Sequence, residues 1–373
     1  MSGALSLMGW SARPGPGKPR LAGAPLLSFG GIVMTTVALL GIDLGKHCFH
    51  LHGQDVRGRQ VLRKKLNRAR LLPFLAQLPA CVIAMESCGG AHWLARKISA
   101  HGHRVKLIAP QHVRPFVTGN KNDYLDAEAI CEAACRPKTR YVSVKTTEQQ
   151  LLSTEHRIRE SLVRRRTATI NQIHGFLLEF GIALPNTLSA LAQVPMLLEN
   201  PDNDLPLRFQ QLMLRLLDDI QQLTSEIKSL ERSLQLRLKQ DEMAARLLSV
   251  PGIGPVTASA VVADVGDASH YRSSRDFAAS LGLVPRQYST GGGTVLYGIS
   301  KRGDSYLRRL FVQCARSIMR KVEHRNDPLG DWIRDLLLRK HPNKVACALA
   351  NKLARMSWAV LRHGTSYNPQ YLV

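Results

Sequence analysis

The chain has 373 residues, and its hydrophobic content of 45% is enough for real cores in about two or three domains. Lysine and arginine outnumber aspartate and glutamate by 51 to 28, so the formal charge of +23 indicates a polyanionic partner, nucleic acid before an anionic membrane surface. The sequence has no GxGxxG, P-loop or HExxH motif. Its seven cysteines contain no C-x-x-C pair, which favours reduced thiols in a cytoplasmic protein over a disulfide framework or a zinc site.

Residues 1–33 are predicted to be a leader that precedes the first domain. Residues 21–42 carry no charge, but proline and glycines interrupt the run and its second half continues into a predicted strand, so no membrane insertion is expected. Residues 1–33 are rich in Gly, Pro, Ser and Arg and are expected to be unstructured, with Met34 as a candidate natural start.

Residues 34–145 are predicted to form an α/β domain. Strands come first and then alternate with helices, which indicates a mixed sheet with helices on its faces. The predicted strands are 37–42, 47–53, 60–64, 81–85 and 104–108, and the predicted helices are 68–78, 91–100 and 123–135.

Four carboxylates stand at the ends of these elements. Asp43 and Glu86 follow apolar strands, and Asp123 and Asp126 open a helix with a spacing that puts both on one face. Each acid taken singly is simply explained as a turn residue or a helix cap. Together they predict a cation site, because clustered carboxylates repel one another and oxygen-only ligands suit Mg²⁺ or Mn²⁺. Such ions activate a nucleophile and stabilise a leaving oxygen in phosphodiester chemistry.

Residues 146–245 are predicted to form a helical, coiled-coil middle section. Prolines between about 181 and 206 separate one amphipathic helix from a second at 207–238, whose leucines and isoleucines alternate at steps of three and four. This pattern indicates a helical hairpin or a dimer arm. The first helix carries arginines that we expect to contact nucleic-acid phosphates, although a solvated face is the alternative: Arg157, Arg164, Arg165 and Arg166.

Residues 246–365 are predicted to form a mostly helical C-terminal domain, followed by a tail at 366–373. Its first part has the helix-hairpin-helix pattern, in which Gly252 and Gly254 would let backbone N–H groups approach a phosphate. A plain packing element is the alternative.

A hydroxyl pair in the same domain, Ser289 and Thr290, precedes three glycines and a basic loop with Lys301 and Arg302. The pattern is compatible with a nucleophile towards phosphate and equally with a phosphate-binding loop.

Taken together, these stretches resemble the transposases of the insertion sequences 110, 116 and 902, with the related Piv-type DNA invertases. The resemblance extends from about residue 36 to 365. The family has four acidic residues in the order Asp, Glu, Asp, Asp (DEDD). In the N-terminal part they are matched by Gly41-Ile-Asp43-Leu-Gly-Lys46, Met85-Glu86-Ser87 and Lys121-Asn-Asp123-Tyr-Leu-Asp126-Ala127. In the C-terminal part a second block is matched by Val250-Pro-Gly-Ile-Gly254, Gly282-Leu-Val-Pro285, Ser289-Thr-Gly-Gly292 and Ile299-Ser-Lys-Arg-Gly303.

The resemblance implies a first domain that is RNase H-like, similar to RuvC junction resolvases, with Mg²⁺ or Mn²⁺ bound by Asp43, Glu86, Asp123 and Asp126. It implies a serine that forms a covalent phosphoserine link with DNA. In some relatives the serine directly precedes the glycine, and Thr290 holds that position here. Ser289 is the preferred nucleophile because a primary hydroxyl is less hindered, and Thr290 is the alternative. Lys121, Lys301 and Arg302 would neutralise phosphate charge.

The resemblance also implies partners. The substrate would be DNA at the element ends and target, guided by a structured RNA from the same element. The protein would act as a homo-oligomer, a dimer or tetramer, that brings the acids of one subunit to the serine of another.

Two other functions remain open at this point. A metal-dependent junction resolvase would use water and no serine. Residues 41–45 also resemble the phosphate-binding strand of actin-like ATPases, which usually need a second glycine-rich phosphate loop, and none is visible.

Overall fold

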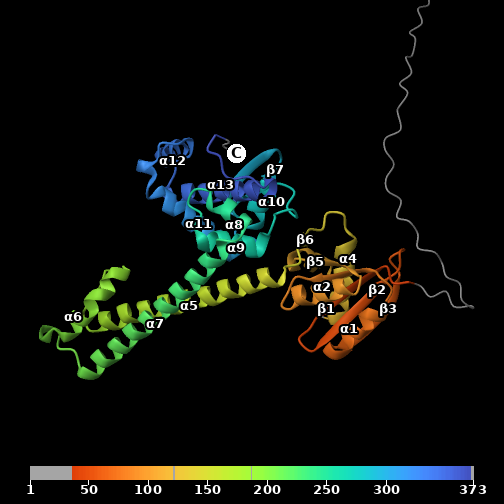
Figure 1. Ribbon diagram of the computed structural model, residues 1–373, viewed down its shortest axis with the longest axis horizontal. Coiled ribbons are helices and arrows are strands. Elements are labelled where there is room, and N and C mark those ends of the chain that lie inside the picture. Colours follow the sequence, from red (N-terminus) through yellow and green to blue (C-terminus); the bar gives the residue numbers. More distant parts are fainter. Residues whose placement is uncertain (1–35, 121, 186, 371–373) are drawn as a thin grey trace, which may run out of the picture.

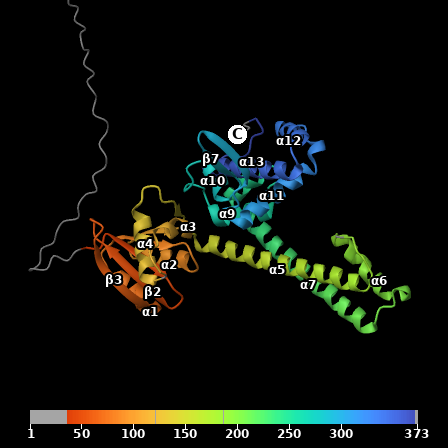
Figure 2. The ribbon, with the colours of Figure 1, turned by 180° about the vertical axis from the view of Figure 1, so that it is seen from behind.

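The structure is a computed structural model that describes residues 36–120, 122–185 and 187–370 (Figures 1 and 2). The expected leader at 1–33, the candidate start Met34 and Lys121 lie outside the described residues. The described part has an N-terminal α/β lobe, a long helical hairpin and a C-terminal lobe that is mostly helical (Figure 1). None of its helices combines the length and the apolar character that crossing a membrane requires.

A six-stranded mixed sheet forms the centre of the N-terminal lobe, in the order β3-β2-β1-β4-β5-β6. The pairs β2–β3, β1–β2 and β5–β6 are antiparallel, whereas β1–β4 and β4–β5 are parallel. The strands are β1 (Leu39–Leu44), β2 (Cys48–Gln54), β3 (Gln60–Asn67), β4 (Val82–Glu86), β5 (Arg104–Ile108) and β6 (Tyr141–Val142).

Helices cover both faces of this sheet. On one face α1 (Arg68–Gln77) and α2 (Ala91–Ala100) bury their apolar side chains against Leu40 and Ile42 of β1. On the other face α3 (Pro110–Val113) and α4 (Asp123–Cys135) pack against Ala84 and Ile108, after a short 3₁₀ turn at Arg114–Phe116. The three-layer arrangement agrees with the predicted mixed sheet between helices.

Helix α4 approaches β1 so closely that only glycine fits at position 41. A Cβ on Gly41 would overlap the carbonyl oxygen of Ala127 and lie 2.8 Å from Sγ of Cys131, both in α4. The missing side chain therefore lets the helix lie directly on the strand. This contact sets how near the first turn of α4 comes to the end of β1.

We expect Gly41→Ala to lower the free energy of unfolding by about 2 kcal/mol, within the range found for overpacked cores. The backbone carbonyl of Ala127 cannot move without shifting α4, so the strain is not relieved by a side-chain rotation. Denaturant unfolding of the purified chain measures the effect. Gly298→Ala is the matched control, since Gly298 also lies in a strand and a Cβ there meets nothing within 4 Å. Equal stability of the two variants would contradict the close-approach argument.

The helical hairpin consists of α5 (Thr147–Glu179) and α7 (Leu207–Leu238), and it extends away from both lobes (Figures 1 and 2). Arg159 pairs with Glu231, whereas Arg166 further along α5 reaches back to Thr224, so the helices run antiparallel. At the far end, short helices connect them at Leu188–Gln193, Val194–Glu199 (α6) and Pro201–Asn203. The predicted hairpin is confirmed, with the break where the prolines indicated it.

The C-terminal lobe packs around Phe277 and Phe311, which are both fully buried in one apolar cluster. Its helices are α8 (Glu242–Leu248), α9 (Pro255–Val265), α10 (Ser274–Ser280), α11 (Ser305–Met319), α12 (Pro328–Arg339) and α13 (Pro342–His363), with a 3₁₀ turn at Val322–His324. A β-hairpin of β7 (Pro285–Thr290) and β8 (Gly293–Ile299) projects from the lobe. One of the two alternatives for this stretch is a phosphate-binding loop, and the structure has two paired strands there with a short turn between them.

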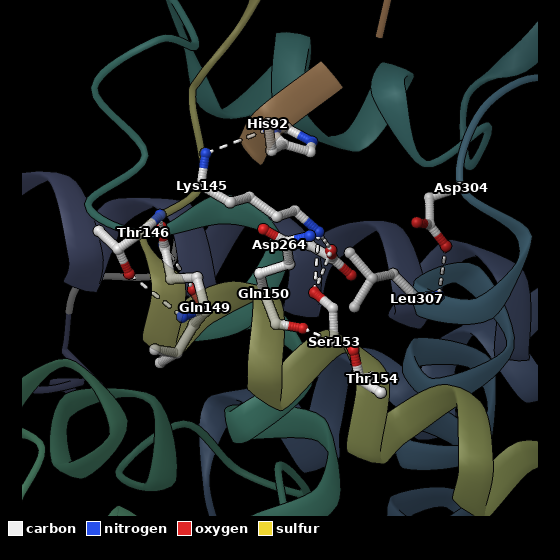
Figure 3. A network of polar contacts seen from close by, with 11 residues as sticks. His92, Lys145, Thr146, Gln149, Gln150, Ser153, Thr154, Asp264, Asp304 and Leu307 are labelled. Carbon is white, nitrogen blue, oxygen red and sulfur yellow. Dashed lines mark hydrogen bonds and ion pairs between the residues drawn. The ribbon is translucent and has the colours of Figure 1, made fainter. Parts of the chain in front are cut away.

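The two lobes meet at the start of α5 through polar contacts (Figure 3). The Lys145 ammonium pairs with Asp264 of α9 and donates a 2.9 Å hydrogen bond to Ser153. Arg96 of α2 donates to the Lys145 carbonyl at 2.6 Å and to Gln150 at 2.8 Å. Within the described residues, the apolar clusters of the lobes are separate. Charged and polar groups therefore make a large contribution to the relative placement of the lobes.

Candidate metal centre and serine hairpin

Two of the predicted carboxylates stand at the ends of adjacent parallel strands. Ile42 of β1 pairs with Met85 of β4, and Asp43 and Glu86 follow directly after this pair. Neighbours in register on parallel strands point to the same face of a sheet. Asp43 shares its face with Gly41, two residues earlier, so both side chains project on the side that α4 covers.

Helix α4 supplies the other two carboxylates. The side chain of Asn122 caps the helix by accepting a 3.0 Å hydrogen bond from the N–H of Tyr124, so Asp123 is the first helical residue and Asp126 lies one turn on. Carboxylate oxygens of Asp43, Asp123 and Asp126 all lie within 4.8 Å of one another. These three residues are called the acid triad below. The structure thus brings together side chains that are about 80 positions apart in the sequence.

Glu86 lies beside the acid triad but outside that distance group. Its pKa is raised by burial first and then by the charges of Asp43 and Asp126. Burial, followed by Asp126 and Asp123, likewise raises the pKa of Asp43. The four carboxylates therefore share one electrostatic environment in which their negative charges oppose one another.

The donor set fits a divalent cation. It offers only oxygen atoms and is partly buried. Burial first, and then the neighbouring negative charges, raise the pKa of Asp43 and of Glu86, and a bound cation would favour the ionised form of both. Hard ions such as Mg²⁺ and Mn²⁺ prefer such carboxylate ligands. Asp43, Asp123 and Asp126 are the residues that could hold the ion, with Glu86 adjacent.

The candidate nucleophile lies in the C-terminal lobe, on the exposed β7–β8 hairpin (Figure 1). The hydroxyl of Ser289 accepts a 2.7 Å hydrogen bond from Nε2 of Gln287 and lies 3.3 Å from the hydroxyl of Thr294 across the hairpin. Thr290 pairs with Gly293 and, one residue on, faces the other side. The two hydroxyls therefore occupy different surfaces.

Two of the glycines after Thr290 have a structural role. Gly291 and Gly292 have φ values of +54° and +81°, and they form the two-residue turn between the strands. A two-residue hairpin turn with φ > 0 at both positions strongly favours glycine. The turn accounts for this glycine pair without a phosphate cradle.

Lys301 and Arg302 lie at the base of the hairpin, separated from the end of β8 by Ser300. The N–H of Lys301 donates to the carbonyl of Gly282 at 3.1 Å, and a Cβ on Gly282 would overlap the carbonyl oxygen of Arg302. The two motif segments therefore pack backbone to backbone. Ser289 lies near the opposite end of the hairpin. Along β7 it is about 13 Å from Pro285 at the base, at about 3.3 Å per residue.

The arginines predicted to bind phosphate do not form one surface. Arg164 pairs with Glu160, which also pairs with Arg309, and Arg166 donates to Thr224 of α7. Arg157 lines the junction between the lobes, and Arg165 is exposed. Among the described residues, Arg157 and Arg165 have no carboxylate partner within 4 Å, so they are the better candidates for phosphate contact.

The glycines of the predicted helix-hairpin-helix differ in their surroundings. Gly252 has φ +75°, and a Cβ there would lie 2.6 Å from the side chain of Ile318 in α11, so packing in the core requires this glycine. A Cβ on Gly254 would meet no atom within 4 Å. Gly254, at the start of α9, is thus the more open of the two positions.

One polar residue at the acid triad was missed in the sequence. His50 of β2 pairs in register with Asp43 of β1, so their side chains share a face. Alternation within 48–54 puts His50 on the same face as His52 and Gln54, but only the register of the hairpin shows which of them meets the acids.

Comparison with known proteins agrees with this architecture. A family model described as Transposase, for DEDD transposases of the IS110 type, matches residues 40–182, and the model described as Transposase IS116/IS110/IS902 family matches residues 244–328. The transposase for insertion sequence element IS1328 of Yersinia enterocolitica is 51% identical over 90% of this chain and 100% of its own length. The probable family 20 transposase of Pseudomonas aeruginosa is 47% identical over 88% and 98%, and the transposase for IS1111A of Coxiella burnetii is 38% identical over 90% and 92%.

Proposed function

This chain belongs to the IS116/IS110/IS902 family of transposases, enzymes that cleave and rejoin DNA, and we propose that it does so with a metal-bound acidic site and a serine nucleophile. The observation that carries the proposal is the convergence of Asp43, Asp123 and Asp126 within 4.8 Å. The order of the first five strands, β3-β2-β1-β4-β5, with the first three antiparallel, supports an RNase H-like domain similar to RuvC.

In this proposal the acid triad and Glu86 hold one or two Mg²⁺ or Mn²⁺ ions. Bound there, such an ion would polarise the scissile phosphate and favour loss of the proton from the attacking hydroxyl. The fold of the chain sets the positions of these carboxylates. Gly41 lets α4 lie on β1, and the Asn122 cap fixes where Asp123 and Asp126 begin the helix.

The hydroxyl oxygen of Ser289 attacks the phosphorus of a DNA phosphodiester and forms a phosphoserine ester. The bond from phosphorus to one deoxyribose oxygen breaks, and that oxygen leaves with the proton that the serine loses. Attack by the hydroxyl of another strand reverses the step and rejoins the DNA, so no high-energy cofactor is required. The exposure of Ser289 near the end of the hairpin supports this role.

The placement of the two sites in different lobes supports assembly. The acid triad belongs to the N-terminal lobe and Ser289 to the C-terminal lobe. A dimer or tetramer that pairs the acids of one subunit with the serine of another would complete the site. The charge of +23 supports binding to nucleic acid, and we propose DNA and a guide RNA from the element as the partners.

Removal of metal tests the proposal. Purified protein with its element-derived RNA and DNA should form a covalent protein–DNA adduct and exchange strands in Mg²⁺ or Mn²⁺, and both should disappear in EDTA and return when metal is added back. Denaturing gels of end-labelled DNA detect the adduct and the rejoined product. Adduct formation in EDTA would contradict the metal site. Metal-dependent nicking without an adduct would favour the water-dependent resolvase instead.

A further inference from the structure

His50 is fixed against the acid triad. Its Nδ1 lies 3.5 Å from Oδ2 of Asp123 and 4.0 Å from Oδ2 of Asp43, and the residue is only 4% exposed. A single ring atom thus reaches one carboxylate from the sheet and one from α4. These two carboxylates belong to different elements, and His50 is directly between them.

The neighbours of the imidazole restrict its position. Its ring lies edge to face with the ring of Tyr124 at 4.7 Å between centroids. The Arg63 guanidinium lies 4.3 Å from the centre of the same tyrosine ring. Because Tyr124 is in the first turn of α4, this packing also holds the helix start in place.

Asp123 depends on this contact more than the other acids do. Its side chain is 53% exposed, and within the described residues His50 is the only side chain within hydrogen-bond or ion-pair distance of its carboxylate. An exposed aspartate at a helix start otherwise samples several rotamers. Ordering it costs entropy that a bound cation would have to offset.

We propose that His50 is a positioning residue that holds the carboxylates of Asp43 and Asp123 in the arrangement that binds the divalent cation, an inference that rests on the proposed metal site. Nδ1 of His50 faces the Oδ2 atom of each carboxylate, which leaves the Oδ1 atoms for a cation. Groups that orient metal ligands in this way typically contribute a factor of about 10 to 100 in metal affinity.

A pair of substitutions separates this role from packing. His50→Asn keeps an N–H donor near the position of Nδ1 but loses the ring, whereas His50→Phe keeps the ring against Tyr124 but has no donor. We expect His50→Phe to weaken Mn²⁺ binding at least about tenfold and His50→Asn to stay within about threefold of the parent chain. Electron paramagnetic resonance of free Mn²⁺, titrated into the full-length protein without nucleic acid, measures the affinity.

Two controls make the outcomes distinct. His52→Phe alters another buried histidine on the same face of β2, and we expect Mn²⁺ affinity to be unchanged. Asp43→Asn should abolish the binding; if it does not, the proposed metal site itself is wrong. If Asp43→Asn loses Mn²⁺ while His50→Phe binds like the parent chain, the metal site stands and the role of His50 is overturned. Loss in His50→Asn but not in His50→Phe would also overturn it, because packing would then be the cause. Thermal unfolding confirms that each variant is folded.

Discussion

Asp126→Asn should abolish strand exchange, by at least about a hundredfold, without loss of folding or of DNA and RNA affinity. Loss of a single group that stabilises the transition state costs about this much, and a metal ligand contributes at least as strongly. Asn keeps the shape of the side chain and removes its charge. The charge of Asp126 is among the causes that raise the pKa of Asp43 and of Glu86. Its removal therefore relieves repulsion in the metal-free protein.

This relief gives the prediction its second part. The free energy of unfolding of Asp126→Asn, measured without metal, should equal or exceed that of the parent chain. Inactivity then cannot be attributed to unfolding. Glu128→Gln is the matched control, because Glu128 is an exposed acid in the same helix that does not belong to the acid triad. Strand exchange at the parental rate by Asp126→Asn, or an equal loss in Glu128→Gln, would remove the acid triad from the mechanism.

Much of the N-terminal lobe could be predicted from local pattern. Helix α4 begins and ends where the sequence placed it, at Asp123 and Cys135, because Asn122 supplies a cap and alanines follow. Strands β1 and β4 are apolar runs with an acid at or directly before the last residue, which indicates both the strand and its functional end. Convergence of the acids was predictable because adjacent parallel strands end at one edge of the sheet.

Other features depend on contacts that local pattern does not contain. The β7–β8 hairpin is exposed along nearly its whole length, so it lacks the apolar alternation that usually indicates a strand, and its glycines were attributed to a loop. His50 was missed because its partner is fixed by the β1–β2 register. The motif around Gly252 predicted a phosphate contact. The sequence could not show that Ile318 packs against this glycine.

The hairpin geometry distinguishes between Ser289 and Thr290. Ser289→Ala should abolish the covalent adduct, and Thr290→Ala should retain it with at most a modest loss of rate. Ser289 carries a primary hydroxyl whose oxygen already accepts from Gln287, whereas Thr290 carries a branched side chain beside the turn and faces the other surface. A secondary hydroxyl is more hindered as a nucleophile towards phosphorus. The reverse result would assign the attack to Thr290.

The double variant tests the covalent step itself. With Ser289 and Thr290 both replaced by alanine, we expect no adduct and no rejoined product, at any metal concentration, in an assay that quenches with detergent and separates protein-linked DNA. The hairpin is exposed and both replacements are small, so the fold should tolerate them. Thermal unfolding and RNA affinity serve as controls. Strand exchange by the double variant would mean that the strands are joined without a serine or threonine ester, and the acid triad would then act on a hydroxyl from water or from DNA.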